Sequence, residues 1–198
     1  MNLLSKWTSN PTTYRSSITA SSEQVYNALS FSVLESKAKN ILEIGFYYGA
    51  SAVTMLELDP DITVTSIDPG IHDCTLEAAP LVKEYYGDRF RFIQDDSKNI
   101  LNYVSGEQFD FAYVDGDHKP LPVLRDIKSC LSLNIPYLLF DDIYEDITES
   151  NYHPKTSRNG VSIAVNQMQL KGLIKPIKHW YIPEVKSKMK LYKTTKET

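Results

Sequence analysis

The sequence predicts an α/β fold: a doubly wound, mostly parallel sheet of seven strands with an antiparallel hairpin at its C-terminal end. Five short runs, apolar nearly throughout, alternate with helical stretches between residues 40 and 142. Strands of this composition are buried on both faces, which is typical of parallel sheets covered by helices. Beyond residue 172 the alternation ends. Two strand-like runs then follow each other with residues 184–187 between them, which indicates a hairpin at the sheet edge.

Each element follows from its local pattern. A first helix is expected over residues 22–36, with Ser22 as its N-cap and apolar residues at helical spacing. The expected parallel strands are residues 40–46, 63–68, 90–95, 109–115 and 135–142. Further helices are expected at 51–58, 77–86, 123–133 and 162–172, and the hairpin strands at 175–183 and 188–195. We therefore divide the chain into an N-terminal arm or lid, residues 1–21, and one domain, residues 22–198.

Composition and charge exclude several classes of protein. The net charge is −4, which argues against binding to nucleic acid or to an anionic membrane surface. No window approaches 18 consecutive apolar residues, and the N-terminal residues turn polar too soon for a signal peptide. The two cysteines, Cys74 and Cys130, have no metal-ligand spacing and favour a reducing compartment. We expect a cytoplasmic protein.

Acidic side chains recur where the predicted parallel strands end. A single carboxylate in such a place is an ordinary helix cap. In a doubly wound sheet, however, the carboxyl ends of the strands meet at one edge, and ligands bind there. The sequence therefore predicts a shared cleft lined by strand-end acids, which after the first strand are Asp68, Asp95, Asp96, Asp115, Asp117, Asp141 and Asp142.

The turn after the first strand has the features of a cofactor-binding loop. Gly45 and Gly49 in ILEIGFYYGAS leave room for a ligand to approach the backbone. The helix that begins at Ala50–Ser51 offers unpaired N–H groups. Asp68, which ends the second strand, can accept hydrogen bonds from two ribose hydroxyls. Together these features favour a cofactor that contains a nucleoside.

The ordered segments ILEIGFYYGAS, SID, FIQDDSKNIL, FDFAYVDGDH and LLFDD resemble the motifs of class I S-adenosylmethionine-dependent methyltransferases, which have a Rossmann-like sheet. The resemblance covers residues 22–193. It implies S-adenosylmethionine as the cofactor, with the methionine part at the glycine turn, the ribose at the second strand end and adenine at the third. The cofactor-binding residues that it implies are Glu43, Gly45, Gly49, Ser51, Asp68, Asp96, Ser97 and Asp115.

The segments YVDGDHKP and LLFDDIY resemble a narrower group, the metal-dependent O-methyltransferases that modify sugars and natural products. This resemblance implies one Mg²⁺ ion held by Asp115, Asp141 and Asp142, and oxygen ligands of this kind suit that ion. It places the general base at Asp117 or His118. We favour His118, since the ordinary histidine pKa of about 6.5 lies near working pH. Such a site would help a hydroxyl group to attack the sulfonium methyl group.

The motifs leave several hypotheses about the acceptor and the reaction open. The acceptor is expected to be a small molecule or a glycan, and a phenol, as in the catechol-type enzymes, is the nearest alternative to a sugar. A lyase reaction on the same cofactor and a protein that binds the cofactor without catalysis are two more hypotheses. The edge hairpin is compatible with a homodimer. The arm and a polar insertion at 149–160 are candidate lids, whereas His72, His153 and His179 are expected at the surface or in packing.

Overall fold

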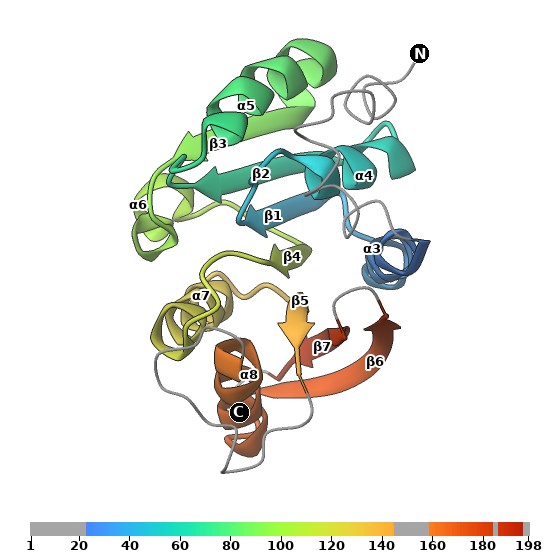
Figure 1. Cartoon of the computed structure of the whole chain (residues 1–198), viewed down its shortest axis with the longest axis vertical. Coiled ribbons are helices and arrows are strands. Elements are labelled where there is room, and N and C mark those ends of the chain that lie inside the picture. The colour runs from blue at the N-terminus through green and yellow to red at the C-terminus, as the bar shows by residue number, and fades with distance from the viewer. Residues whose placement is uncertain (1–22, 145–158, 184–185, 196–198) are drawn as a thin grey trace.

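The computed structural model describes residues 23–144, 159–183 and 186–195. The predicted arm, Ser22, His153 and most of the insertion at 149–160 lie outside these residues. Within them the predicted alternation of strands and helices is present (Figure 1). None of the helices in these ranges is both long and apolar enough to cross a membrane.

The strands in the described residues form one seven-stranded sheet. They are β1 (Asn40–Ile44), β2 (Thr63–Asp68), β3 (Phe90–Gln94), β4 (Phe111–Val114), β5 (Tyr137–Ile143), β6 (Ile174–Ile182) and β7 (Ser187–Thr194). Their order across the sheet is β3-β2-β1-β4-β5-β7-β6. The first five pair in parallel, while β7 pairs antiparallel with both β5 and β6. The predicted fold class is confirmed, including the hairpin at the edge.

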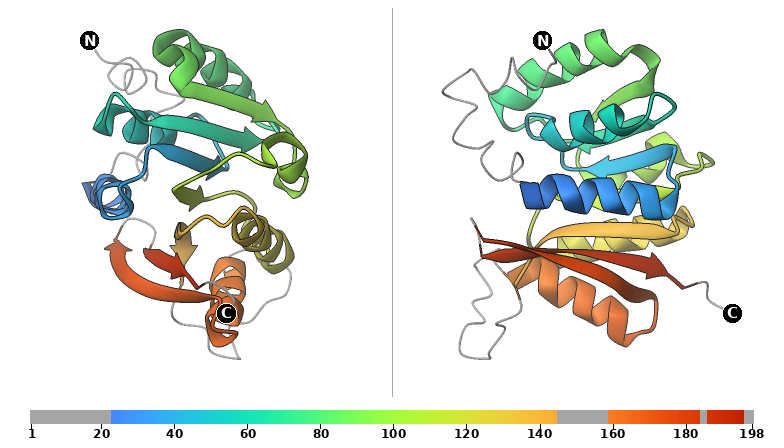
Figure 2. Two further views of the ribbon diagram at one scale, coloured as in Figure 1. Left: turned by 180° about the vertical axis from the view of Figure 1, so that it is seen from behind. Right: turned by 90° about the vertical axis from the view of Figure 1, so that its right-hand side faces the viewer.

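Helices cover both faces of this sheet (Figure 2). One face packs against α3 (Glu23–Ser36), α4 (Ala50–Leu58) and α5 (Asp73–Tyr86), and the other against α6 (Leu101–Val104), α7 (Pro120–Ser132) and α8 (Gly160–Leu170). Each face carries its own cluster of buried apolar side chains. The central strands are apolar nearly throughout because both of their faces are buried, as in other sheets with helical crossovers.

The order of the strands creates the place for a ligand. From β1 the chain runs outward to β2 and β3, then returns to add β4 and β5 on the other side of β1. The connections that leave β1 and β4 therefore diverge, and a crevice opens between them at the carboxyl ends of the strands. This is the edge at which the sequence predicts a cleft.

The structure contains short helical elements that the sequence did not predict. Residues Gly87–Arg89 (η1) and Ser97–Asn99 (η2) form 3₁₀ turns, and η2 leads into α6. The side chain of Asp96 accepts a hydrogen bond from the backbone N–H of Lys98 at 3.0 Å, and Asp95 accepts one from the Tyr103 hydroxyl at 2.7 Å. Local bonds of this kind stabilise a turn without any hydrophobic period, so periodicity does not reveal it.

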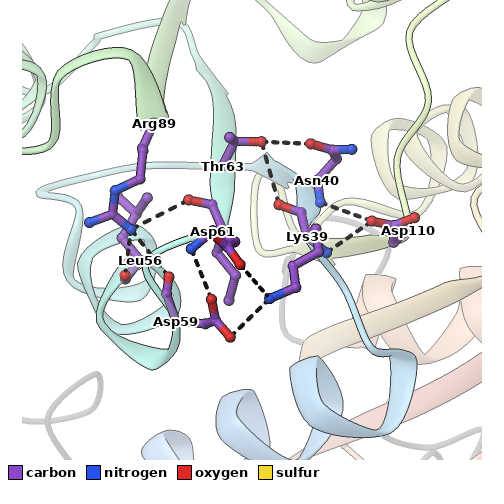
Figure 3. A network of polar contacts seen from close by, with 9 residues as sticks. Lys39, Asn40, Leu56, Asp59, Asp61, Thr63, Arg89 and Asp110 are labelled. Atoms are coloured by element: carbon purple, nitrogen blue, oxygen red, sulfur yellow. Dashed lines mark hydrogen bonds and ion pairs between the residues drawn. The ribbon is translucent and has the colours of Figure 1, made fainter.

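A polar network ties the loops together at the opposite edge, where the strands begin (Figure 3). Asp110 Oδ2 accepts hydrogen bonds of 2.9 Å from the backbone N–H groups of both Lys39 and Asn40. The Arg89 guanidinium donates to the carbonyl oxygen of Leu56 at 3.0 Å. The polar groups of this network bond to one another within the fold, whereas the acids at the carboxyl ends of the strands surround a cavity.

Candidate active site

A cavity of about 680 Å³ opens at the carboxyl ends of β1, β2 and β4. Its lining comes from the turns that follow β1, β2, β3 and β4 and from one face of α7. A volume of this size suits a small-molecule or cofactor site. The predicted site residues in the lining are Gly45, Asp68, Asp96, Ser97, Asp115, Asp117 and His118.

Gly45 is the point at which the turn after β1 touches the turn after β4. Its φ angle is +92°, and a Cβ atom added there would lie 2.1 Å from the carbonyl oxygen of Asp115. Its own N–H donates to the carbonyl oxygen of Ile67 at 2.9 Å, so the backbone is held from a second side. Both the backbone angle and the close approach require glycine here.

Glu43, Gly49 and Ser51 do not belong to the cavity lining. Glu43 is fully buried and accepts hydrogen bonds from the hydroxyl groups of Ser51 and Ser66. Gly49 precedes α4 with a φ angle of +83°, and a Cβ atom there would lie 2.4 Å from the ring of Phe46. These contacts hold the glycine turn from within the protein, and a direct contact between these residues and a cofactor stays a prediction.

We expect Glu43 to make the protein less stable as pH rises. Burial raises the pKa of this carboxyl group from 4.5 to about 8. Below pH 4.5 it is protonated in the folded and unfolded states alike. Between pH 4.5 and 8 the unfolded chain releases this proton and the folded state does not, so relative stability falls. Glu43→Gln should therefore unfold about 5 °C above the wild type at pH 8, with a smaller gap at pH 5.

Thermal unfolding at both pH values measures this gap. The control is Glu77→Gln, which makes the same replacement at an exposed position. A Glu43→Gln gap that is equal at pH 5 and pH 8 would mean that Glu43 is ionised in the folded protein.

Asp68 holds the glycine turn in addition to lining the cavity. Its Oδ2 accepts hydrogen bonds from the backbone N–H groups of Phe46 and Tyr47 at 2.9 and 3.0 Å. Its Oδ1 accepts one from the N–H of Gly70 at 2.8 Å. A carboxylate has about four lone-pair positions, so about one is left for a ribose hydroxyl. Removing the Asp68 side chain would disturb the turn as well as any ligand contact.

Asp96 and Ser97 bring the turn after β3 into the cavity lining. The backbone N–H and the ammonium group of Lys98 both bond to the Asp96 carboxylate, the latter at 3.1 Å. The backbone bond is the main cause that holds the pKa of Asp96 below its ordinary value. This turn therefore presents an ionised carboxylate and a hydroxyl group to the cavity.

Three carboxylates from the ends of β4 and β5 gather around His118 and Tyr113. The Tyr113 hydroxyl lies 3.1 Å from Asp115 Oδ2 and 3.2 Å from Asp141 Oδ2. His118 Nε2 lies 3.4 Å from Asp115 Oδ1, and its Nδ1 lies 3.2 Å from Asp142 Oδ2. Asp142 has a φ angle of +54° at an irregularity in β5. The fold thus brings the three predicted metal ligands into one cluster.

Burial and crowding change the pKa values in this cluster. Burial raises the pKa of Asp141 to about 8, and the charges of Asp115 and Asp142 add to the rise. The hydrogen bond to Asp115 is the main cause that raises the pKa of His118 to about 9. In this arrangement His118 is protonated at neutral pH, so the argument from the ordinary histidine pKa does not apply. The assignment of the base to His118 or Asp117, with His118 favoured, stays a prediction.

The cluster supplies the kind of ligands that Mg²⁺ prefers, since all three groups are carboxylates. His118, however, lies between Asp115 and Asp142. In the part of the chain that the structure describes, no three acidic, histidine or cysteine side chains are arranged so that they could hold a metal ion. The residues fit Mg²⁺ by ligand type, and the ion itself stays a proposal.

The cavity and its surroundings include residues that the sequence analysis did not assign to the site. His72, expected at the surface or in packing, is exposed but also lines the cavity, where its ring lies 5.2 Å from that of Tyr47. Gly160 begins α8, and a Cβ atom there would lie 2.0 Å from the carbonyl oxygen of His118. No local signal reveals this contact, because the two residues are far apart in the chain. His179 is exposed on β6, as expected.

Comparisons with known proteins agree with the fold. Residues 42–143, just over half of the chain, match the model of a family described as a methyltransferase domain. No curated protein matches the sequence significantly. An O-methyltransferase from Bacillus cereus, solved in complex with S-adenosylhomocysteine, has a TM-score of 0.72 and 16% identity, over 90% of this chain and 84% of that chain.

Two further structures show the same likeness. The S-adenosylhomocysteine-bound methyltransferase PaMTH1 from Podospora anserina has a TM-score of 0.68 and 21% identity, over 98% of this chain and 87% of that chain. The O-methyltransferase TomG from Streptomyces achromogenes, which is involved in tomaymycin synthesis and was solved with S-adenosylmethionine, has a TM-score of 0.67 and 18% identity, over 99% of this chain and 100% of that chain. At these levels of identity the likeness establishes the fold.

Proposed function

This chain belongs to the methyltransferase domain family whose model covers residues 42–143, and from that premise we propose that it is an S-adenosylmethionine-dependent O-methyltransferase. We propose that Mg²⁺ assists the reaction and that the acceptor is a hydroxyl group of a sugar or another small hydroxylated molecule. One observation supports the proposal most directly. The cavity beside the carboxyl ends of β1 and β4 is lined both by predicted cofactor residues and by Asp115 and His118 of the acidic cluster.

The cofactor half of the proposal rests on the order of groups along the cavity. Gly45 and Asp68 contribute from the turns after β1 and β2, and Asp96 with Ser97 from the turn after β3. This order suits an extended molecule with a nucleoside at one end and an amino acid at the other. Solved structures of the same fold carry S-adenosylmethionine or S-adenosylhomocysteine.

The acceptor half rests on groups that can take a proton and stabilise charge. The acceptor oxygen must lose its proton as it attacks the methyl carbon in line with the leaving sulfur. His118 and Asp117 both line the cavity and are the candidates for this task, and His118 must first lose the proton that it carries at neutral pH. Asp115 and Asp142 hold the His118 ring from two sides, and the N–H of Lys119 holds Asp117 at 2.9 Å. Both side chains are therefore positioned before an acceptor binds.

Asp115, Asp141 and Asp142 are the residues that would hold Mg²⁺. When bound, such an ion would supply the positive charge that stabilises the acceptor oxygen as it becomes an alkoxide. The same carboxylate cluster would serve a phenolic hydroxyl group, so a catechol-type acceptor is the second candidate. We propose neither nucleic acid nor membrane as a partner, because the net charge of −4 repels polyanions. A homodimer through the edge hairpin stays a proposal.

Calorimetric titration with S-adenosylhomocysteine, once with Mg²⁺ and once with EDTA, tests the two halves separately. We expect a dissociation constant of about 1–10 μM in both conditions, since Asp115 is the one residue shared by the predicted cofactor residues and the carboxylate cluster. Nucleotide sugars, glycans and catechols are then screened as methyl acceptors, with Mg²⁺ or EDTA present. Absence of binding in both conditions would contradict the cofactor assignment, and equal turnover with EDTA would contradict the role of the metal. Binding without transfer to any acceptor would favour a non-catalytic cofactor-binding protein.

A further inference from the structure

Asp126 is a buried acid in the cavity lining that neither the predicted motifs nor the proposed reaction uses. It lies in the middle of α7, on the same helix face as Pro122 and Arg125, which also line the cavity. Its side chain is only 1% exposed. Ser97, from the turn after β3, belongs to the same lining. Asp126 and Ser97 therefore border the same cavity from two different elements.

The Asp126 carboxyl group lacks the partners that a buried acid normally has. Neither of its oxygen atoms has a hydrogen-bond partner of ordinary length and angle among the residues that the structure describes, although the Ser97 side chain lies near enough to act on its pKa. Burial raises the pKa of this group to about 7, the Ser97 side chain opposes the rise, and the charges of Asp96 and Asp117 add to it. An unpaired polar group in this position lowers the stability of the folded protein, because water no longer satisfies it.

A buried group without a partner inside the fold points to a partner on the ligand. The ionised carboxylate only accepts, so the ligand atom that pairs with this form must be a hydrogen-bond donor. Under the proposed function the ribose hydroxyls of S-adenosylmethionine would lie at Asp68, and its ammonium group would lie at the amino acid end near Gly45. The remaining donor is the exocyclic amino group of adenine. This step rests on the proposed function, which places adenine at the end of β3 beside Asp96 and Ser97.

We propose that Asp126 accepts a hydrogen bond from the exocyclic amino group of adenine and thereby selects an adenine nucleoside in the cavity. The acid is then satisfied when the cofactor is bound and unsatisfied when it is absent. A base without the amino group leaves a buried oxygen unpaired and binds more weakly. Loss of one such bond to a buried polar group is worth roughly tenfold in affinity.

The test compares two ligands on the full chain. One is S-adenosylhomocysteine, and the other is its 6-deamino analogue, in which unsubstituted purine replaces adenine. The wild type should bind the first roughly tenfold more tightly. Asp126→Leu keeps the branched shape of the side chain but removes both acceptor oxygens, so it should bind the two ligands equally. Asp126→Asn keeps one acceptor oxygen and should retain most of the preference.

The unfolding temperature without ligand is a second measurement, and a purely structural role of Asp126 predicts the opposite change in it. Because Asp126→Leu removes an unpaired buried acid, its unfolding temperature should be equal to or above that of the wild type. A structural Asp126 would instead make this variant less stable.

The outcomes separate this inference from the proposed function. Equal binding of the two ligands by the wild type would overturn the assignment of Asp126 while leaving the cofactor in place. An Asp126→Leu variant that still prefers the amino group would overturn it as well. Absence of S-adenosylhomocysteine binding to the wild type would overturn the proposed cofactor and this inference with it. A preference that is present in the wild type and absent in Asp126→Leu would establish the contact.

Discussion

Replacing Gly45 with alanine should abolish measurable binding of S-adenosylhomocysteine and lower the unfolding temperature by about 10 °C. The added Cβ atom would lie 2.1 Å from the carbonyl oxygen of Asp115 and 2.9 Å from the Cα atom of Gly116. Both contacts are with backbone, which cannot move aside as a flexible side chain can. The clash would push the turns after β1 and β4 apart, and both of these turns line the cavity. Calorimetry and thermal unfolding measure the two effects.

Gly106 offers a matched control for this variant. Its φ angle of +90° is close to the +92° of Gly45, but a Cβ atom there would meet no atom within 4 Å. Gly106→Ala therefore carries the backbone strain alone, about 1 kcal/mol, and should bind the ligand as the wild type does. If Gly45→Ala were to behave like Gly106→Ala in both measurements, the close approach of the two turns would not matter for the site.

Replacing Asp141 with asparagine should remove the effect of Mg²⁺ and leave cofactor binding intact. A saturating ion that binds the folded protein alone should raise the unfolding temperature of the wild type by about 3–5 °C. Asp141→Asn keeps the shape of the side chain but removes one of three carboxyl groups from the cluster around His118 and Tyr113, so it should show little of this rise. With an acceptor found by screening, methyl transfer should fall on the order of a hundredfold. Affinity for S-adenosylhomocysteine should stay within about threefold, because Asp141 lies outside the cavity lining.

Asp110→Asn is the control for the loss of an acid elsewhere. Asp110 lies at the opposite edge of the sheet, where it bonds to the backbone of Lys39 and Asn40 (Figure 3). This variant should keep the rise in unfolding temperature with Mg²⁺. Full transfer by Asp141→Asn, at the rate of the wild type and independent of Mg²⁺, would remove the metal from the proposed reaction.

The type and order of the main elements could be predicted because each has a local cause. The runs that became β1 and β4 are apolar nearly throughout, so their burial in a parallel sheet is visible in the sequence. The short turn η2 and the helix α6 were missed, because hydrogen bonds of Asp95 and Asp96 stabilise them without an apolar period. The local apolar pattern therefore predicts the elements that build the core. It does not predict short elements that polar side chains stabilise.

The sequence also determined which edge of the sheet carries the candidate site. Parallel strands end at the same edge, so acids that follow successive strands must gather there. Asp68, Asp96 and Asp115 line one cavity for this reason. Asp141 and Asp142, which lie near the end of β5, join the same edge through their contacts with Tyr113 and His118.

Only the tertiary structure decided what each of these acids does. Glu43 accepts hydrogen bonds from Ser51 and Ser66. Asp68 accepts two hydrogen bonds from the backbone of the glycine turn and one from the N–H of Gly70, whereas the oxygen atoms of Asp126 have no partner of ordinary geometry among the described residues. The pKa of His118 rises to about 9 because Asp115 bonds to it and further acids lie beside it. Burial and hydrogen bonding depend on which residues, distant in the chain, the fold places next to each other. The sequence therefore determines where the carboxyl groups gather, and the packing around each one determines whether it holds the protein together or faces a ligand.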